Sequence, residues 1–100
     1  MDERQQLVAR WFALTRTDMP VVAKERGWPV HLDHCFQRIL LDNAVQGAWR
    51  KAMPAPAWRN ASAAQLTRAI ELGEAALAGD ADLVELNRRS LEWRGKRRGG

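Results

Sequence analysis

The stretch HLDHCFQRILLDNAVQG, residues 31–47, has the clearest helical pattern in this 100-residue chain. Its apolar residues recur every three or four positions, and they are Leu32, Cys35, Phe36, Ile39, Leu40, Ala44 and Val45. This spacing puts them on one face of an α-helix, and Gly47 is placed to end that helix. The sequence therefore predicts a central core helix in which Cys35 is buried. His31 and Asp33 precede it, where polar side chains can cap the first turn.

Two more helices are predicted on the N-terminal side of this stretch. Asp2 can cap the first, which ends near Arg16. Asp18 can cap a short second helix over Pro20–Arg26, because proline is favoured in the first turn of a helix. Gly27 can end the second helix in the left-handed conformation.

Residues 48–60 contain Pro54 and Pro56, which prevent one continuous helix. We call this segment the strap and expect it to pack over the helices, because its tryptophans and methionine are too apolar to remain in water. Ser62-Ala-Ala-Gln65 is a capping box that opens the next helix.

The last two predicted helices complete an all-α fold. Gly79 can end the helix that begins after Ser62, and Asp80 can cap a final helix that runs to Trp93. No alternating strand pattern is present. We therefore predict a compact bundle of four to five helices that forms a single domain over residues 1–93, followed by a basic, mobile tail over residues 94–100.

The net charge of +4 comes entirely from the tail, because residues 1–93 carry equal numbers of acidic and basic side chains. Thirteen of the 16 basic residues are arginines, which favour planar contacts to phosphate or carboxylate groups. The charged N-terminus does not resemble a secretory signal, and a lone cysteine cannot form an internal disulfide. We therefore expect a cytoplasmic protein with no membrane association.

The reactive residue types in the central helix do not combine into a catalytic or metal site. A zinc site needs three or four ligands, whereas His34 and Cys35 are adjacent on a helix and point in different directions. No catalytic residue, metal or cofactor is predicted. His34, Arg38 and Asp42 are spaced by four residues and share a more polar face, which suits either an anion site or an ordinary charge ladder.

The five tryptophans divide into two predicted groups. Trp11, Trp28 and Trp49 are expected to fill the core, whereas Trp58 and Trp93 are each followed by arginine and are candidates for an exposed stacking surface.

The chain resembles a small family of short bacterial proteins over most of its length. The resemblance rests on WPVHLDHCFQRILLDNA (28–44), a later tryptophan at Trp49, PAWR (56–59) and DLVELNRRSLEWRGK (82–96). Some members of that family are labelled GCN5-related N-acetyltransferases, so the resemblance implies acetyl transfer in a mixed α/β fold. The residues themselves favour an all-α fold, and the Gly-rich turn that holds a pyrophosphate at a helix N-terminus is missing.

Two functions from different classes follow from these residues. The first is a non-enzymatic helical domain that binds nucleic acid, with DNA favoured over RNA. The phosphate contacts would come from Arg26, Arg38, Arg50, Lys51, Arg59, Arg94, Lys96, Arg97 and Arg98. A helix-turn-helix unit over residues 21–40 is only a partial match, since Arg26 and Asp33 occupy positions that such units keep apolar.

The second function is a protein–protein adaptor. Its docking surface would be the strap or an acidic face formed by Glu71, Glu74, Asp82 and Glu85. An acetyltransferase-like protein, as the resemblance implies, is the third alternative, and the oligomeric state is left open.

Overall fold

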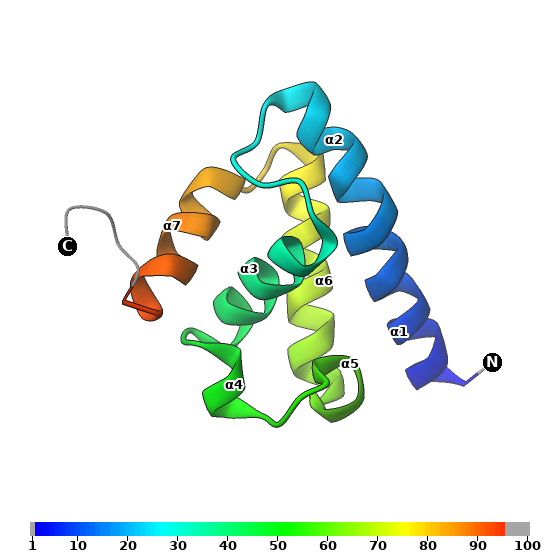
Figure 1. Ribbon diagram of the computed structural model, residues 1–100. Coiled ribbons are helices and arrows are strands. Elements are labelled where there is room, and N and C mark those ends of the chain that lie inside the picture. The colour runs from blue at the N-terminus through cyan, green and yellow to red at the C-terminus, as the bar shows by residue number, and fades with distance from the viewer. Residues whose placement is uncertain (1, 96–100) are drawn as a thin grey trace.

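Every regular element between residues 2 and 95, the part of the chain that the computed structural model describes, is helical (Figure 1). The elements are α1 (Glu3–Ala13), η1 (Leu14–Asp18), α2 (Met19–Arg26), α3 (Asp33–Val45), α4 (Trp49–Ala52), α5 (Ala57–Asn60), α6 (Ala63–Ala78) and α7 (Leu83–Trp93). The predicted all-α bundle is confirmed. No helix in this range is both long and apolar enough to cross a membrane.

The first two predicted helices form one continuous helical rod. Asp18 has helical dihedral angles and makes no capping hydrogen bond, so the predicted break before Pro20 is wrong. A π-helical turn, η1, joins the two halves, and the Met19 N–H donates to the Leu14 carbonyl. Because proline has no N–H to donate, the wider turn just before Pro20 lets the chain continue without a break. Asp18 instead accepts a hydrogen bond from Arg10 at 2.8 Å.

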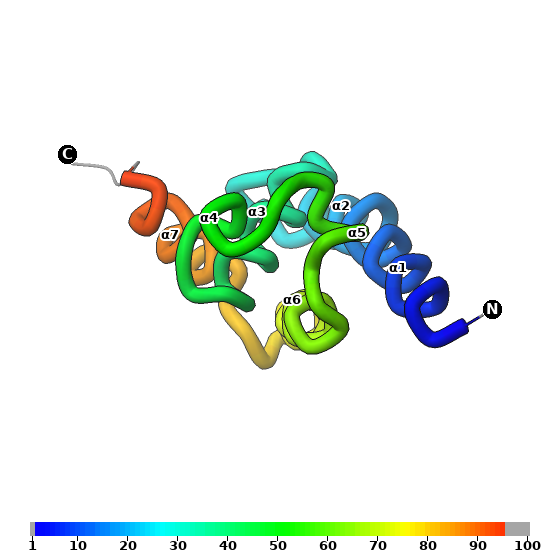
Figure 2. The backbone as a smooth tube through the Cα atoms, turned by 90° about the horizontal axis from the view of Figure 1, so that it is seen from below, coloured from blue at the N-terminus to red at the C-terminus, as the bar shows by residue number. Residues whose placement is uncertain are grey.

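Helix α3 lies in the middle of the bundle and packs against both α6 and α7. Seen from below, α1 and α7 lie at opposite ends of the molecule with α3 and α6 between them (Figure 2). This position broadens the buried face of α3 beyond the predicted stripe. Leu41 and Asp42 are buried, whereas Leu32 is exposed. Cys35 is only partly buried, so the prediction of a fully buried thiol is wrong.

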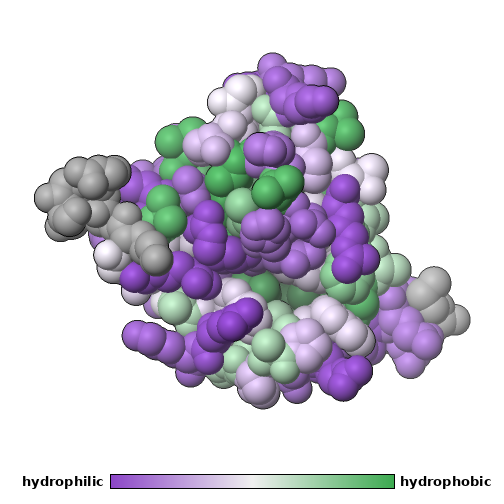
Figure 3. Space-filling view, in the orientation of Figure 1, coloured by the Kyte–Doolittle hydropathy of each residue, from purple (hydrophilic) through white to green (hydrophobic). Residues whose placement is uncertain are grey.

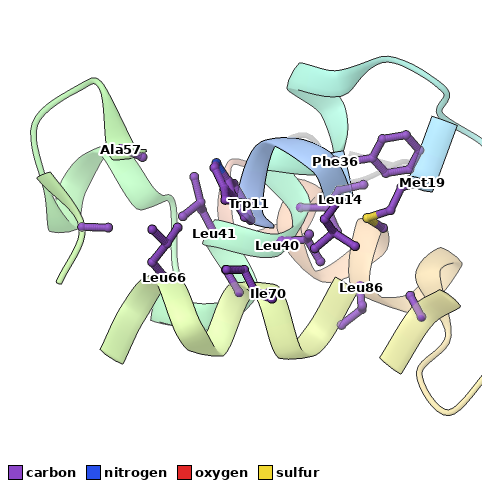
Figure 4. Packing of buried hydrophobic residues seen from close by; sticks show 14 of the residues in the cluster. Trp11, Leu14, Met19, Phe36, Leu40, Leu41, Ala57, Leu66, Ile70 and Leu86 are labelled. Atoms are coloured by element: carbon purple, nitrogen blue, oxygen red, sulfur yellow. The ribbon is translucent and has the colours of Figure 1, made fainter. Parts of the chain in front are cut away.

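The contact between α3 and α6 is close because a glycine faces it. A Cβ atom placed on Gly73 would lie 2.6 Å from Cδ2 of Leu14 and 2.9 Å from Cδ1 of Leu40, and both leucines are fully buried. A larger residue would overpack the core at this point. Nearby, Trp11 from α1, Leu41 from α3 and Ile70 from α6 point toward one another (Figure 4).

The predicted caps agree with the structure at some helix ends and differ at others. Asp2 caps α1 and Ser62 forms a capping box, as predicted; Asp2 also forms a capping box, with Gln5, and Gly27 and Gly79 adopt the left-handed conformation. Helix α7, however, is capped by Asp82, whose carboxylate accepts from the N–H groups of Val84 and Glu85, so the prediction of Asp80 is wrong.

The end of α3 also differs from the prediction. Gln46, and not Gly47, takes the left-handed conformation there, with φ of 58°. The Asp33 carboxylate accepts from the His34 N–H at 2.7 Å at the other end of the helix.

The strap runs along the bottom of the bundle in Figure 1 and contains the short helices α4 and α5. Met53 and Ala57 are buried against the core, and Trp49 packs against it with part of its surface exposed. Trp28 is likewise partly buried, whereas Trp11 is 1% exposed. The strap therefore covers one end of α3 while its second tryptophan, Trp58, stays 37% exposed.

Candidate functional site

A cleft of about 480 Å³ lies between α3, the end of α1 and the strap. Its lining includes four aromatic side chains, Trp11, Phe12, Trp49 and Trp58, and four cationic or titratable nitrogen groups, His34, Arg38, Arg50 and Arg94. No carboxylate lines it among the described residues. Figure 3 shows a hollow in the lower half of the molecule with hydrophobic atoms on its floor and hydrophilic residues on both sides. A volume of this size is typical of ligand sites.

Arg38 is a partly buried cation in the cleft. Its guanidinium donates to the Ser90 hydroxyl at 2.6 Å and to the Asn87 side-chain carbonyl at 2.9 Å. Both acceptors are neutral, and no carboxylate of the described chain lies within 4.0 Å of it. Burial lowers the pKa of Arg38, and the Arg94 cation acts in the same direction, whereas Cys35 and the Asp42 carboxylate raise it and offset part of the shift. An anion that entered the cleft would offset both effects.

Asp42 fixes the neighbouring cation. Its carboxylate is fully buried and accepts from Arg94 Nε at 2.6 Å and Arg94 Nη2 at 3.0 Å. It also accepts from the Ser90 hydroxyl at 2.7 Å and from the Trp49 backbone N–H at 2.9 Å. The hydrogen bonds to Asp42 raise the pKa of Arg94. One buried carboxylate therefore ties together α3, α7 and the start of the strap.

This network corrects two predictions. Arg94 was assigned to a mobile tail, but it is only 25% exposed and belongs to the folded domain. The predicted polar face of His34, Arg38 and Asp42 is not one open surface either. Arg38 and Asp42 face α7, whereas the His34 side chain is 73% exposed and lies 3.6 Å from Asp33. The difference arises because α7 covers this side of α3, which the spacing within α3 cannot reveal.

The strap contains two tryptophan–arginine pairs, of which Trp49, Arg50 and Trp58 line the cleft and Arg59 does not. The Arg50 guanidinium lies 5.3 Å from the ring centroid of Trp49, and the Arg59 guanidinium lies 5.2 Å from that of Trp58. Trp58 also contacts Phe12 edge to face at 6.3 Å. Arg50 and Arg59 are exposed, so these contacts leave both cations accessible to solvent. Trp58, predicted to be exposed, is 37% exposed and lines the cleft.

The remaining predicted phosphate contacts lie elsewhere. Arg26 donates to the Ala76 and Leu77 carbonyls and so caps the end of α6, away from the cleft lining. Lys51 is exposed on α4 but does not line the cleft. Lys96, Arg97 and Arg98 lie outside the described residues.

The predicted acidic face is largely paired within the molecule. Glu74 accepts from Arg10 at 2.9 Å, and Glu85 pairs with Arg88 and Arg89. Asp82 is occupied as the cap of α7. Three of the four residues of the predicted acidic face thus have partners in the chain.

Sequence reasoning missed several residues that build the cleft. Phe12 and Gln37 line it, and Ser90 and Asn87 hold Arg38 in place. Ser90 did leave a signal, because it falls on the same face of α7 as the buried Leu83 and Leu86. A polar residue at such a position requires a buried polar partner.

Within residues 2–95, no group of three or more histidine, cysteine, aspartate or glutamate side chains could hold a metal ion. No family model matches the chain, and no match was found among curated proteins or solved structures. The resemblance to short bacterial proteins therefore stays a prediction, and the function has to be argued from the cleft.

Proposed function

We propose that this protein binds nucleic acid through the cleft between α3 and the strap. The observation that carries the proposal is Arg38, a half-buried cation that faces an aromatic-lined cleft without a carboxylate partner. Burying a charge is costly unless it is paired, so an anionic ligand is the natural complement. Phosphate also suits the bidentate geometry of arginine.

Nucleic acid fits this cleft better than a small inorganic anion because the lining combines cations with aromatic rings. Bases stack on aromatic side chains while phosphates pair with arginine. Arg50 and Arg59 extend the positive charge along the strap. The basic residues Lys96, Arg97 and Arg98 would add nonspecific affinity.

Helix-turn-helix binding is not part of this proposal. The second helix of such a unit must present its side chains to the major groove. Here α3 packs against α6, α7 and η1, and residues 27–32 separate it from α2. Its apolar side chains are therefore engaged inside the bundle, and His34, Gln37 and Arg38 line the cleft.

The test is a fluorescence anisotropy titration of labelled DNA with Arg38→Gln and with Arg68→Gln. Both variants remove one positive charge, but Arg68 is exposed on α6 and does not line the cleft. We expect Arg38→Gln to weaken binding about tenfold or more at 50 mM salt, since a well-formed bidentate or charge-assisted contact contributes roughly 1–3 kcal/mol. Arg68→Gln should weaken it much less.

A triple variant with glutamine at positions 96, 97 and 98 separates the cleft from the tail. Binding that resides in the cleft persists in this variant and is less sensitive to a change from about 50 to 200 mM salt. If the full-length chain binds neither DNA nor RNA at the lower salt, the proposal fails. The adaptor function would then come first, with exposed Trp58 as its most suitable contact residue.

A further inference from the structure

We infer that the cleft selects unpaired strands over duplexes, an inference that rests on the proposed function and specifies its ligand. The aromatic rings line a hollow and do not form a protruding surface. In a duplex, the faces of the bases are stacked on one another and only their edges are exposed in the grooves. Rings inside a cleft can reach a base face only when that base is unstacked and turned outward.

The partly buried position of the Arg38 guanidinium also favours a single-stranded ligand. Arg38 is held by Ser90 and Asn87 beside the buried Asp42–Arg94 pair, so its guanidinium cannot move far toward solvent. A phosphate that reaches it must enter the cleft together with its nucleotide. A single strand can bend so that one nucleotide enters the cleft. In a duplex, base pairing holds every phosphate on the outer surface of the double helix.

Trp58 is the residue on which a base is expected to stack. It is 37% exposed, lines the cleft, and is held by its edge-to-face contact with Phe12. Arg59 lies over the ring at 5.2 Å, but an exposed cation–π contact is weaker than base stacking. A base can therefore displace the guanidinium, which then becomes available to the adjoining phosphate.

A second hollow shares Trp58 with the cleft. It is lined by Arg4, Gln5, Val8, Ala9, Trp58 and Arg59. Because Trp58 lines both hollows, a strand that leaves the cleft across this ring meets another apolar surface with arginines beside it. The ligand is therefore an oligonucleotide, and a mononucleotide should bind more weakly.

The experiment compares labelled (dT)12, a 12-base-pair duplex and unlabelled thymidine monophosphate as a competitor, all with the full chain at about 50 mM salt. We expect (dT)12 to bind at least tenfold more tightly than the duplex, and the mononucleotide to compete only weakly. Trp58→Ala should lower the affinity for (dT)12 about tenfold and the affinity for the duplex much less, since stacking contributes on that scale for each unstacked base.

Trp93→Ala is the matched control. Trp93 is also 37% exposed and is also followed by arginine, but it does not line the cleft. We expect no change in (dT)12 affinity. Trp58→Leu, which keeps an apolar side chain against Phe12 but has no ring for stacking, replaces Trp58→Ala if the latter unfolds by circular dichroism.

The outcomes separate this inference from the proposed function. Equal affinity for (dT)12 and duplex, or equal losses in the Trp58 and Trp93 variants, overturns the inference while nucleic-acid binding stands. Absence of binding to both DNA forms and to RNA overturns the proposed function itself.

Discussion

Helix α7 carries two arginine–carboxylate contacts of nearly the same length in very different surroundings. On its inner face, Arg94 lies 2.6 Å from Asp42, whose side chain is completely buried. On its outer face, Arg88 lies 2.7 Å from Glu85, and both side chains are well exposed, at 51% and 38%. Distance alone therefore does not distinguish a contact that holds the fold from one that water can replace.

The difference lies in what happens when one partner is lost. Water and salt solvate Arg88 at once if Glu85 is removed, so an exposed pair contributes little. Removal of Asp42 leaves Arg94, the Ser90 hydroxyl and the Trp49 N–H without their shared acceptor. The inner contact thus joins three segments, and it also sets the position of Ser90, which in turn holds Arg38 at the cleft.

The largest expected effect is that of Asp42→Ala. Breaking a buried ion pair by removing one partner typically costs 3–5 kcal/mol. Because Arg94 is 25% exposed and can turn toward water, we expect a loss at the lower end, about 3 kcal/mol in the free energy of unfolding. Urea denaturation followed by circular dichroism measures it. Glu85→Ala is the control on the outer face, and an equal loss there would show that the two contacts do not differ.

A smaller effect is expected at the first turn of α7, because both Asp80 and Asp82 are candidate N-cap residues in the sequence. Asp82→Ala removes the acceptor of the Val84 and Glu85 N–H groups and should cost about 1 kcal/mol. Asp80→Ala should stay within about 0.5 kcal/mol, because an exposed residue outside the cap contributes little. Thermal unfolding of both variants checks this order. A larger loss for Asp80→Ala would restore the sequence-based assignment of the cap.

These contrasts explain which parts of the fold the sequence could predict. The cap at Asp2, the capping box at Ser62 and the left-handed Gly27 depend on residues that are neighbours in the chain, and all of them were predicted. The continuity of the helix through Asp18 was not predicted, because a π-helical turn accommodates Pro20 without a break.

The site was harder to predict because its parts are distant in sequence. Arg38 and Arg50 were candidates on their residue type alone, but nothing in their spacing shows that Phe12 and Trp58 complete the same cleft. Asp42 seemed polar and exposed because its burial depends on α7, about 50 positions later in the chain. Helical periodicity describes one helix at a time, whereas burial of a charge is decided by the partner helix.

The smallest expected effect concerns the pH dependence of the exposed Glu85–Arg88 pair on the outer face of α7. The hydrogen bond from Arg88 lowers the pKa of Glu85 from 4.5 to about 2. A group whose pKa is lower in the folded state stabilises the fold above its unfolded pKa and loses that contribution as the pH falls. The Glu85 contribution is therefore complete above about pH 4.5 and disappears as the pH approaches 2.

An NMR titration of the Glu85 side-chain carboxyl carbon measures this pKa directly. We expect the midpoint near pH 2 at low salt to move upward in Arg88→Gln, because the main hydrogen-bond donor is lost. Added salt should also move it upward, since both side chains are exposed and the attraction is screened. The loss in stability caused by Asp42→Ala should change far less over the same range of salt, because the Asp42–Arg94 contact is shielded from solvent. If the two contacts respond equally to salt, burial is not what separates the two faces of α7.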